Sequence, residues 1–176
     1  MSSFGDNTHH FSYVYYTKAD THFMKAKIKL PLGFRFLNKN DNLSSFNCGT
    51  PALDDYIREN ASNWIDDPAH LVIVHVVKKK ICGLMDLEIY AGHVELAVLA
   101  RNMKVRLPED VKVGSRLARL AENISKQLGK KEIRLEAMQD SHDWWNDRMD
   151  YEQYGQKYAE PTFGELTPKR KFLQLV

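Results

Sequence analysis

One stretch of the chain, residues 94–129, changes its hydrophobic period part of the way along. Residues 94–99 (VELAVL) form a short apolar run of strand length. After a polar segment, apolar residues recur at steps of three and four, as on the buried face of a helix: Val113, Leu117, Leu120, Ala121, Ile124 and Leu128. Gly129 follows as a C-terminal stop. The stretch therefore predicts a strand, a loop and a helix that begins near Gly114, a combination found throughout α/β proteins.

The first turn of this predicted helix has the properties of an anion site. Its N–H groups have no partner within the helix, and together with the helix dipole they favour a phosphate. Gly114 lets the backbone approach such a ligand closely. Glu109 and Asp110 are the acids of the segment 101–119, whereas its basic residues are Arg101, Lys104, Arg106, Lys112, Arg116 and Arg119. We therefore predict that a phosphorylated ligand binds here, with an ordinary solvated helix start as the alternative.

The composition excludes several other classes of protein. A chain of 176 residues with 43% hydrophobic residues, 27% charged residues and a net charge of +2 is typical of one globular domain. No apolar run is long enough to cross a bilayer, and residues 1–29 show no signal-peptide pattern, so we predict a cytoplasmic protein that does not bind membranes. Cys48 and Cys82 are far apart, and the histidines form no pair at ligand spacing. These spacings predict neither a disulfide nor a metal site.

The hydrophobic patterns predict where the other elements lie. Residues 1–29 are polar and rich in aromatics, with Phe11, Tyr13 and Tyr15 alternating as in a strand, and we predict an N-terminal extension there. Residues 30–176 are predicted to form one domain. The expected strands are residues 33–37, 70–77, 81–90, 94–99 and 133–137, and the expected helices are residues 51–61, 114–128 and 143–149.

The order of these elements predicts an α/β (α+β) fold with a mixed, mostly antiparallel sheet flanked by helices. Three antiparallel strands come before the main helix, and the crossover through that helix leads to a parallel strand. Residues 151–157 and 172–176 are further candidate strands, and breaks at Pro161 and Gly164 separate them.

Three segments of the chain resemble the GNAT (general N-acetyltransferase) superfamily. Residues 81–87 (ICGLMDL) resemble its third strand, and residues 99–117 resemble its strand, pyrophosphate loop and helix. Residues 144–155 (WWNDRMDYEQYG) resemble the aromatic segment after its fifth strand. The resemblance implies a GNAT-like sheet and acetyl-CoA as the co-substrate. The residues that it implies for binding acetyl-CoA are Leu99, Ala100, Arg101, Val111, Lys112, Val113, Gly114, Ser115 and Asn146.

The resemblance also implies an activity, the transfer of an acetyl group from acetyl-CoA to a primary amine. The candidate bases are Glu88, Asp86 and Glu95, and we select Glu88 as the predicted catalytic carboxylate. In the family a tyrosine usually donates a proton to the departing thiolate. Trp145 stands in its place here, and an indole N–H is too weak an acid for that role. Tyr151 is therefore predicted as the proton donor, and the alternatives are Tyr154 or departure of the thiolate without a donor.

Residues 43–61 resemble a narrower group, the tRNA-acetylating toxins of toxin–antitoxin pairs. The shared pattern consists of Phe46, Cys48, Gly49, Leu53 and Asp54, which could equally form a packing face and a tight turn. The sequence leaves the acceptor open between an aminoacyl-tRNA, a protein amine and a small amine. A homodimer is one expectation for the oligomeric state.

Two departures from the family's pyrophosphate motif keep other functions open. Glu109 stands where the family has Arg or Gln, and Lys112 stands where it has its first glycine. A catalytically inactive binding module of the same fold is therefore the alternative function. A third hypothesis is a nucleic-acid or protein partner that contacts the basic segments at residues 78–80, 130–131 and 169–171.

Overall fold

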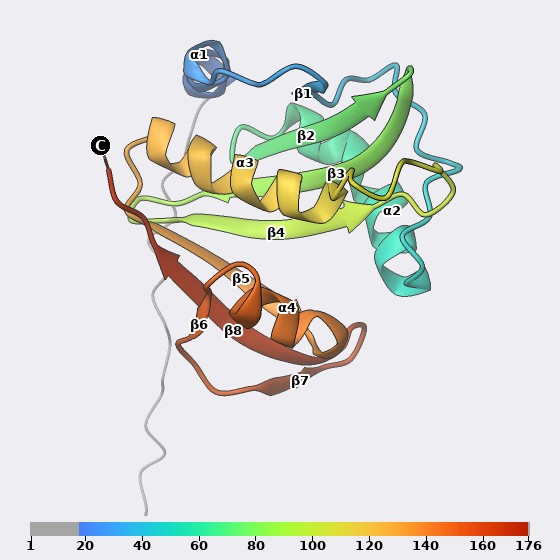
Figure 1. The fold of residues 1–176 in the computed structure, drawn as a ribbon. Helices are drawn as coiled ribbons and strands as arrows, with labels where there is room; N and C mark the ends of the chain where they lie inside the picture. Colours follow the sequence, from blue (N-terminus) through green and yellow to red (C-terminus); the bar gives the residue numbers. More distant parts are fainter. Residues whose placement is uncertain (1–17, 176) are drawn as a thin grey trace, which may run out of the picture.

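The computed structural model describes residues 18–175, which form one twisted sheet with helices on both faces (Figure 1). The strands are β1 (Phe34–Phe36), β2 (His70–Val77), β3 (Lys80–Ile89), β4 (Val94–Arg101), β5 (Glu132–Met138), β6 (Glu152–Gln153), β7 (Tyr158–Glu160) and β8 (Gly164–Phe172). The helices are α1 (Lys18–Lys27), α2 (Pro51–Asp66), α3 (Val113–Gln127) and α4 (His142–Asp147), and a 3-10 turn covers Gln139–Ser141. The sheet order is β1-β2-β3-β4-β5-β8-β6, and β7 pairs with β8.

This topology confirms the predicted fold class. Neighbouring strands from β1 to β4 pair antiparallel, and β5 pairs parallel to β4 after the crossover through α3. The helix start predicted near Gly114 lies at Val113, where α3 begins. The second helix begins at Pro51 as predicted and continues past the predicted end at residue 61 to Asp66.

The predicted end of the sheet was wrong. Within the predicted strand at residues 151–157, only Glu152–Gln153 form a strand. Gly164 does not break the chain but begins β8, with a φ of +79°. β8 pairs with the full length of β5 and ends at Phe172, so residues 173–175, the described remainder of the predicted closing strand, are not in a strand. The strand pattern was hidden because β8 carries Lys169, Arg170 and Lys171 in place of alternating apolar residues.

The described part of the predicted N-terminal extension is helical. Residues 18–27 form α1, Ile28 is buried, and Met24 packs against the same apolar core. The packing of the domain therefore begins before residue 30. The strand-like pattern of Phe11, Tyr13 and Tyr15 lies outside the described residues. Over residues 18–175, no helix combines the length and apolar character that a membrane crossing requires.

The two faces of the sheet hold two apolar cores. α3 covers one face with residues such as Leu117 and Ile124, and α2 covers the other with residues such as Ile57. Because side chains alternate along a strand, Met85 and Leu87 of β3 lie under α3, whereas Leu84 packs on the α2 side. Asp86 and Glu88 therefore point to the α2 face.

A β-bulge in β4 reverses this alternation next to the cleft described below. Asp86 pairs with Val98, whereas the next residue of β3, Leu87, pairs with Leu96. Ala97 is therefore the extra residue of the bulge. Leu96 packs in the α3 core and Val98 in the α2 core. As a result Glu95 lies on the α2 face, and Leu99, beyond the bulge, lies on the α3 face.

β4 and β5 separate soon after they meet. Their ladder consists of the pairs Val94–Ile133 and Glu95–Arg134. Beyond these pairs the two strands diverge, and Figure 1 shows β5 and β8 turning away from β4 toward α4. The sheet is therefore open between β4 and β5 at the end where α3 begins.

Gly83 on β3 sets how closely α3 packs on the sheet. A Cβ at this position would lie 2.5 Å from Val113 Cγ1 and 2.8 Å from Leu117 Cδ1. We expect Gly83→Ala to lower the free energy of unfolding by about 1–3 kcal/mol, measured by urea denaturation, because the added methyl overpacks this contact. Gly92→Ala is the matched control, since nothing lies within 4 Å of its Cβ position. Equal stability of the two variants would contradict the tight packing at Gly83.

Candidate active site

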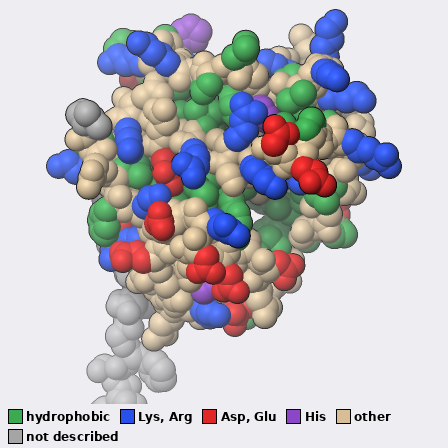
Figure 2. Space-filling view, viewed as in Figure 1, with side chains coloured by type: hydrophobic (Ala, Val, Ile, Leu, Met, Phe, Trp, Pro, Cys, Tyr) green, Lys and Arg blue, Asp and Glu red, His purple; other side chains and the backbone are tan. Residues whose placement is uncertain are grey.

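A cavity of about 420 Å³ follows the gap between β4 and β5. Its lining residues are Leu53, Tyr56, Glu88, Tyr90, His93, Glu95, Leu96, Ala97, Val98, Leu99, Arg134, Leu135, Glu136, Met138, Ser141, Trp145, Tyr154, Phe163 and Leu166. They come from α2, from the strands on both sides of the gap, from α4 and from the turn before β8. Figure 2 shows a hollow on the face that carries α3 and α4, with hydrophobic side chains visible inside it.

One end of the cavity lies beside the start of α3. Arg116 N–H donates to Lys112 O and closes the first turn of the helix. The N–H groups of Gly114 and Ser115 precede this bond and have no hydrogen-bond partner within residues 18–175. A Cβ at Gly114 would lie 3.9 Å from both Leu99 Cδ2 and Trp144 Cζ2. The first turn of α3 therefore opens between the end of β4 and α4, with donors available to an anion.

The charges around this helix start agree with an anion site. All the lysines and arginines between residues 101 and 119 are exposed. Lys104, Arg106 and Lys112 lie in the loop before α3. Glu109 and Asp110 are exposed in the same loop and oppose them. The net local charge is positive, which favours a phosphorylated ligand.

The other end of the cavity, on the α2 face, is acidic. Glu88 and Glu95 are directly opposite each other in the β3–β4 ladder, and Glu136 reaches the cavity from β5. Tyr90 Oη donates a 2.7 Å hydrogen bond to Glu88 Oε2. Like charges in directly opposed positions destabilise a sheet, so their presence at a cavity points to a functional role.

The acidity of Glu95 is strongly perturbed. Burial, together with the charges of Glu136 and Glu88, raises the pKa of Glu95 to about 8. His93 Nε2 lies 3.8 Å from Glu95 Oε2. A carboxylate with a pKa near neutrality can both accept and release a proton under ordinary conditions, which is the property required of a general base.

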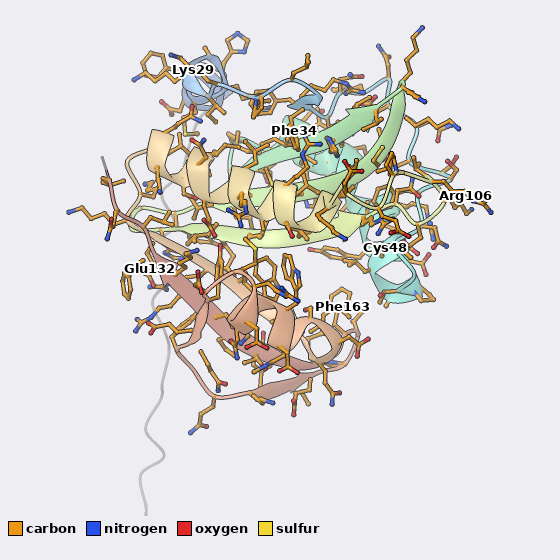
Figure 3. All side chains as sticks on the ribbon, in the orientation of Figure 1. Lys29, Phe34, Cys48, Arg106, Glu132 and Phe163 are labelled. Atoms are coloured by element: carbon orange, nitrogen blue, oxygen red, sulfur yellow. The ribbon has the colours of Figure 1, made fainter. Side chains whose placement is uncertain are left out.

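Two aromatic side chains connect α2 to the turn before β8. The rings of Tyr56 and Phe163 meet edge to face, with 5.7 Å between their centroids. Figure 3 shows Phe163 on the lower part of the molecule, near the first turns of α2. Both residues line the cavity, so this contact narrows its acidic end.

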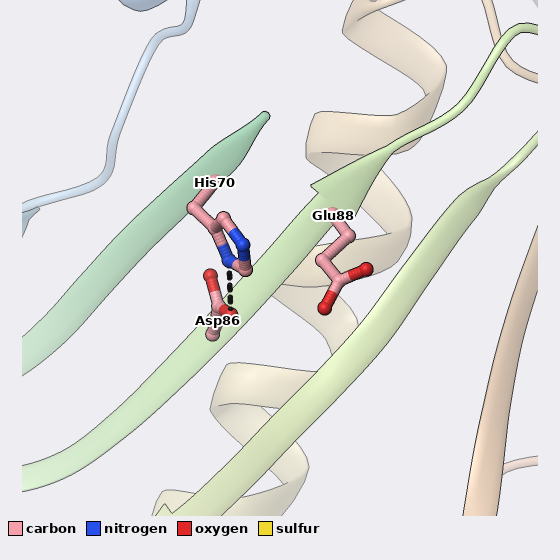
Figure 4. A group of neighbouring side chains, drawn as sticks. All are labelled: His70, Asp86 and Glu88. Atoms are coloured by element: carbon pink, nitrogen blue, oxygen red, sulfur yellow. Dashed lines mark hydrogen bonds and ion pairs between the residues drawn. The ribbon is translucent and has the colours of Figure 1, made fainter. Parts of the chain in front are cut away.

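A hydrogen-bonded pair lies next to Glu88 on the same face (Figure 4). His70 Nδ1 and Asp86 Oδ2 are 2.7 Å apart, and Asp86 is fully buried. Asp86 Oδ1 has no hydrogen-bond partner among the described residues. Burial lowers the pKa of His70, but the hydrogen bond and charge of Asp86 outweigh this and raise it overall. Burial raises the pKa of Asp86, although His70 acts in the opposite direction.

His70 and Asp86, together with Glu88, are spaced closely enough to hold a metal ion, and they form the one such group found within residues 18–175. One ligand atom from each of His70, Asp86 and Glu88 lies within 4.8 Å of the others. In the arrangement observed, His70 Nδ1 and Asp86 Oδ2 bind each other directly, so a metal would have to displace this hydrogen bond. The geometry therefore describes a hydrogen-bonded histidine–aspartate pair beside Glu88.

Several predicted site residues come together at the cavity, and others lie apart from it. Glu88 and Leu99 line it, and the segment from Val111 to Ser115 lies at the start of α3, next to Leu99. Ala100 is buried under α2, and Arg101 is exposed at the end of β4.

Tyr151 and Asn146 do not line the cavity. Tyr151 is buried against Trp145, with 5.0 Å between the ring centroids, and burial together with the charge of Glu122 raises the pKa of its hydroxyl. Asn146 Oδ1 accepts a hydrogen bond from Lys169 Nζ. Tyr154, the alternative donor, does line the cavity.

Other cavity residues were missed by the sequence analysis, namely Tyr56, Tyr90, Glu136 and Phe163. One available signal was the pair of candidate bases, Glu88 and Glu95, on two consecutive strands that were predicted to be antiparallel. No pattern in the sequence indicated that Phe163, in a turn, would reach α2.

The residues that resemble the tRNA-acetylating toxins have structural contacts here. Phe46 is buried in the α2 core, and Gly49 has a φ of +88°. Cys48 N–H donates a 2.7 Å hydrogen bond to Asp54 Oδ1. These contacts explain the shared residues as parts of a tight turn before α2. Leu53, in addition, lines the cavity.

Comparison with known proteins shows the fold. No protein-family model matches the chain, and no curated protein matches it in sequence. Among solved structures, the chain is similar to a GCN5-related N-acetyltransferase from Rhodopseudomonas palustris, with a TM-score of 0.62, 13% identity, and coverage of 80% of this chain and 94% of that one. Ard1 from Thermoplasma volcanium matches with a TM-score of 0.61, 13% identity and coverage of 80% and 97%.

A third similar structure contains a ligand. The Bacillus subtilis acetyltransferase in complex with CoA matches with a TM-score of 0.57, 11% identity, and coverage of 80% of this chain and 98% of that one. At these identities the matches establish the fold, which is that of the GNAT acetyltransferases. The finer resemblance to tRNA-acetylating toxins stays a prediction.

Proposed function

We propose that this protein is an N-acetyltransferase that transfers an acetyl group from acetyl-CoA to a primary amine. The observation that carries the proposal is the cavity in the β4–β5 gap, which holds ionisable carboxylates on the α2 face and reaches Leu99, the neighbour of the anion-favouring start of α3. The likeness to acetyltransferase structures, one of them in complex with CoA, supports the same reaction.

The residues at the helix start fit acetyl-CoA. The N–H groups of Gly114 and Ser115 are available to the pyrophosphate, and the exposed lysines and arginines of the preceding loop add positive charge. The side chains of Leu99 and Trp145 line the gap and suit the apolar part of the pantetheine arm. Acetyl-CoA supplies the activated thioester.

The acidic end of the cavity supplies the proton chemistry. Glu95, in its ionised form, removes a proton from the acceptor ammonium, and the amine nitrogen then forms a bond to the acetyl carbon. The carbon–sulfur bond breaks, and the thiolate takes a proton from Tyr154, which lines the cavity. The reacting nitrogen then loses its second proton to the Tyr154 oxygen, which restores the hydroxyl. Backbone groups on the edge of β4 that faces the gap stabilise the charge on the acetyl oxygen.

A thiol-release assay tests this proposal. The protein is mixed with acetyl-CoA and a panel of primary amines, and free CoA is measured together with the acetylated product. We expect release of CoA that depends on the amine, with one product molecule formed for each CoA. Binding of acetyl-CoA with no turnover on any amine would instead indicate an inactive binding module of the same fold.

Gly114→Ala tests the position of the pyrophosphate. The added methyl meets only ordinary van der Waals contacts with Leu99 and Trp144, so stability should change little. The methyl narrows the approach to the N–H groups of the first turn, and we expect roughly a tenfold loss of acetyl-CoA affinity by calorimetry. Gly92→Ala is the control. Unchanged affinity in Gly114→Ala would show that the phosphates bind elsewhere.

A further inference from the structure

The charged groups at the acidic end of the cavity do not neutralise one another. Three glutamates line it, Glu88, Glu95 and Glu136. Arg134 is the one arginine among the described lining residues, which include no lysine. Arg134 is already engaged, because its Nε and Nη2 donate to the two carboxylate oxygens of Glu132 at 2.9 and 3.1 Å. The end of the cavity therefore lacks at least one positive charge that a ligand could supply.

The two glutamates on β3 and β4 each offer a carboxylate to a cation. Glu95 and Glu88 lie opposite each other, and Glu88 is fixed by the hydrogen bond from Tyr90 Oη. Next to Glu88, the buried carboxylate of Asp86 has His70 as its hydrogen-bonded partner among the described residues. Burial raises the pKa of Tyr56 most, and the negative charges of Glu88 and Asp86 raise it further. Tyr56 therefore lies close enough to both carboxylates to interact with their charges.

The walls between these carboxylates suit a short hydrocarbon chain. Leu53 and Tyr56 of α2 line this part of the cavity, and Phe163 contacts the Tyr56 ring from the opposite side. Aromatic faces also attract ammonium groups. Tyr56 and Phe163 contact each other as part of the cavity wall, and a cavity of about 420 Å³ favours a small acceptor over a folded macromolecule.

We infer that the acceptor is a small aliphatic diamine or polyamine, held with one ammonium at Glu88 beside Tyr56 while the other amine reacts at Glu95. This inference rests on the proposed function and adds the substrate class. In it Glu95 is the base and Glu88 is the specificity-determining residue that binds the second ammonium. The methylenes between the two amines pack on Leu53 and Tyr56.

The experiment compares two acceptors of equal chain length, 1,4-diaminobutane and n-butylamine, in the thiol-release assay. We expect kcat/KM for the diamine to exceed that for the monoamine by roughly tenfold to a hundredfold, since one charge-assisted contact distinguishes them. In Glu88→Gln this ratio should fall close to one. Because both amines are measured on the same variant, a partial loss of folded protein cannot change the ratio.

Glu165→Gln is the matched control, because Glu165 is exposed on β8 and pairs with Lys157 outside the cavity. Its diamine preference should equal that of the unmodified protein. Equal use of both amines by the unmodified protein would overturn the inference and leave the transfer reaction intact. So would acetylation of an aminoacyl-tRNA but not of the diamine.

If no acceptor is acetylated, the proposed function fails, and calorimetric titration with 1,4-diaminobutane still decides the inference. Binding to the unmodified protein that is lost in Glu88→Gln would support the diamine site. Absence of binding, or equal binding to both proteins, would overturn it.

Discussion

Replacing Glu95 by glutamine is expected to lower kcat/KM by roughly 10²- to 10⁴-fold, the range typical for loss of a general base. Acetyl-CoA affinity should stay within about threefold, because Glu95 lies on the α2 face, away from the start of α3. The assay is CoA release with a saturating amine, and Glu165→Gln serves as the control. Retention of kcat/KM within about threefold would show that Glu95 is not the base.

The pH dependence of the same reaction follows from the acidity of Glu95. Its pKa of about 8 in the folded protein means that the ionised form grows as the pH rises. We therefore expect kcat/KM of the unmodified protein to increase about tenfold per pH unit below 8 and to level off above it. A flat profile between pH 6 and 9 would contradict this assignment.

Stability should change in the opposite direction to activity. The pKa of Glu95 is raised above its ordinary value of 4.5, so the folded state holds its proton more tightly than the unfolded state. The contribution of Glu95 to stability is thus fully present below pH 4.5 and is lost as the pH rises through 8. Glu95→Gln should therefore have a higher Tm than the unmodified protein at pH 9 and a similar Tm at pH 4. This result would also show that lost activity is not lost folding.

Replacing His70 by alanine is expected to lower the free energy of unfolding by roughly 3–5 kcal/mol at pH 8, as when one partner of a buried pair is removed. His70 forms the hydrogen bond to Asp86 Oδ2. The second carboxylate oxygen, Oδ1, has no hydrogen-bond partner in the described part of the chain. The imidazole also stacks on Trp64, with 5.9 Å between the ring centroids. Urea denaturation measures the loss.

This destabilisation should shrink as the pH falls. Burial raises the pKa of Asp86, and removing His70 takes away the interactions that oppose this shift. Stability of His70→Ala is therefore lost as the pH rises through the raised pKa and recovers below it, where Asp86 is protonated. In the double variant His70→Ala, Asp86→Leu no buried charge is left, and we expect more than half of the loss to be recovered. A small, pH-independent loss in His70→Ala would contradict the buried-pair account.

Local patterns were sufficient to predict the central elements of the fold. The switch from the apolar run at residues 94–99 to a helical period predicted both β4 and α3, because hydrophobic periodicity directly reflects which face of an element is buried. The end of the chain was not predictable in this way. Lys169 of β8 is fully buried and bonded to Asn146, and a strand with buried lysine carries no apolar alternation.

The candidate site could be predicted only in part. Glu88 and Leu99, two of the predicted residues, line the cavity, and Gly114 lies next to Leu99; all three stand in segments with recognisable neighbours in the sequence. The bulge at Ala97 and the divergence of β4 from β5 were not predicted, since both depend on pairing between strands. Without them, the opposition of Glu88 and Glu95 and the contact of Tyr56 with Phe163 could not be foreseen. The choice between Tyr151 and Tyr154 likewise depended on burial rather than on position in the motif.

The most direct test of the account is a calorimetric titration of the full chain with acetyl-CoA. The central claim is that the gap between β4 and β5, together with the first turn of α3, binds this co-substrate. It predicts one binding site with a Kd of roughly 1–100 µM, in the usual range for an enzyme substrate, and weaker binding in Gly114→Ala. No detectable binding at about 1 mM acetyl-CoA would contradict the claim, because the transfer reaction cannot begin without it.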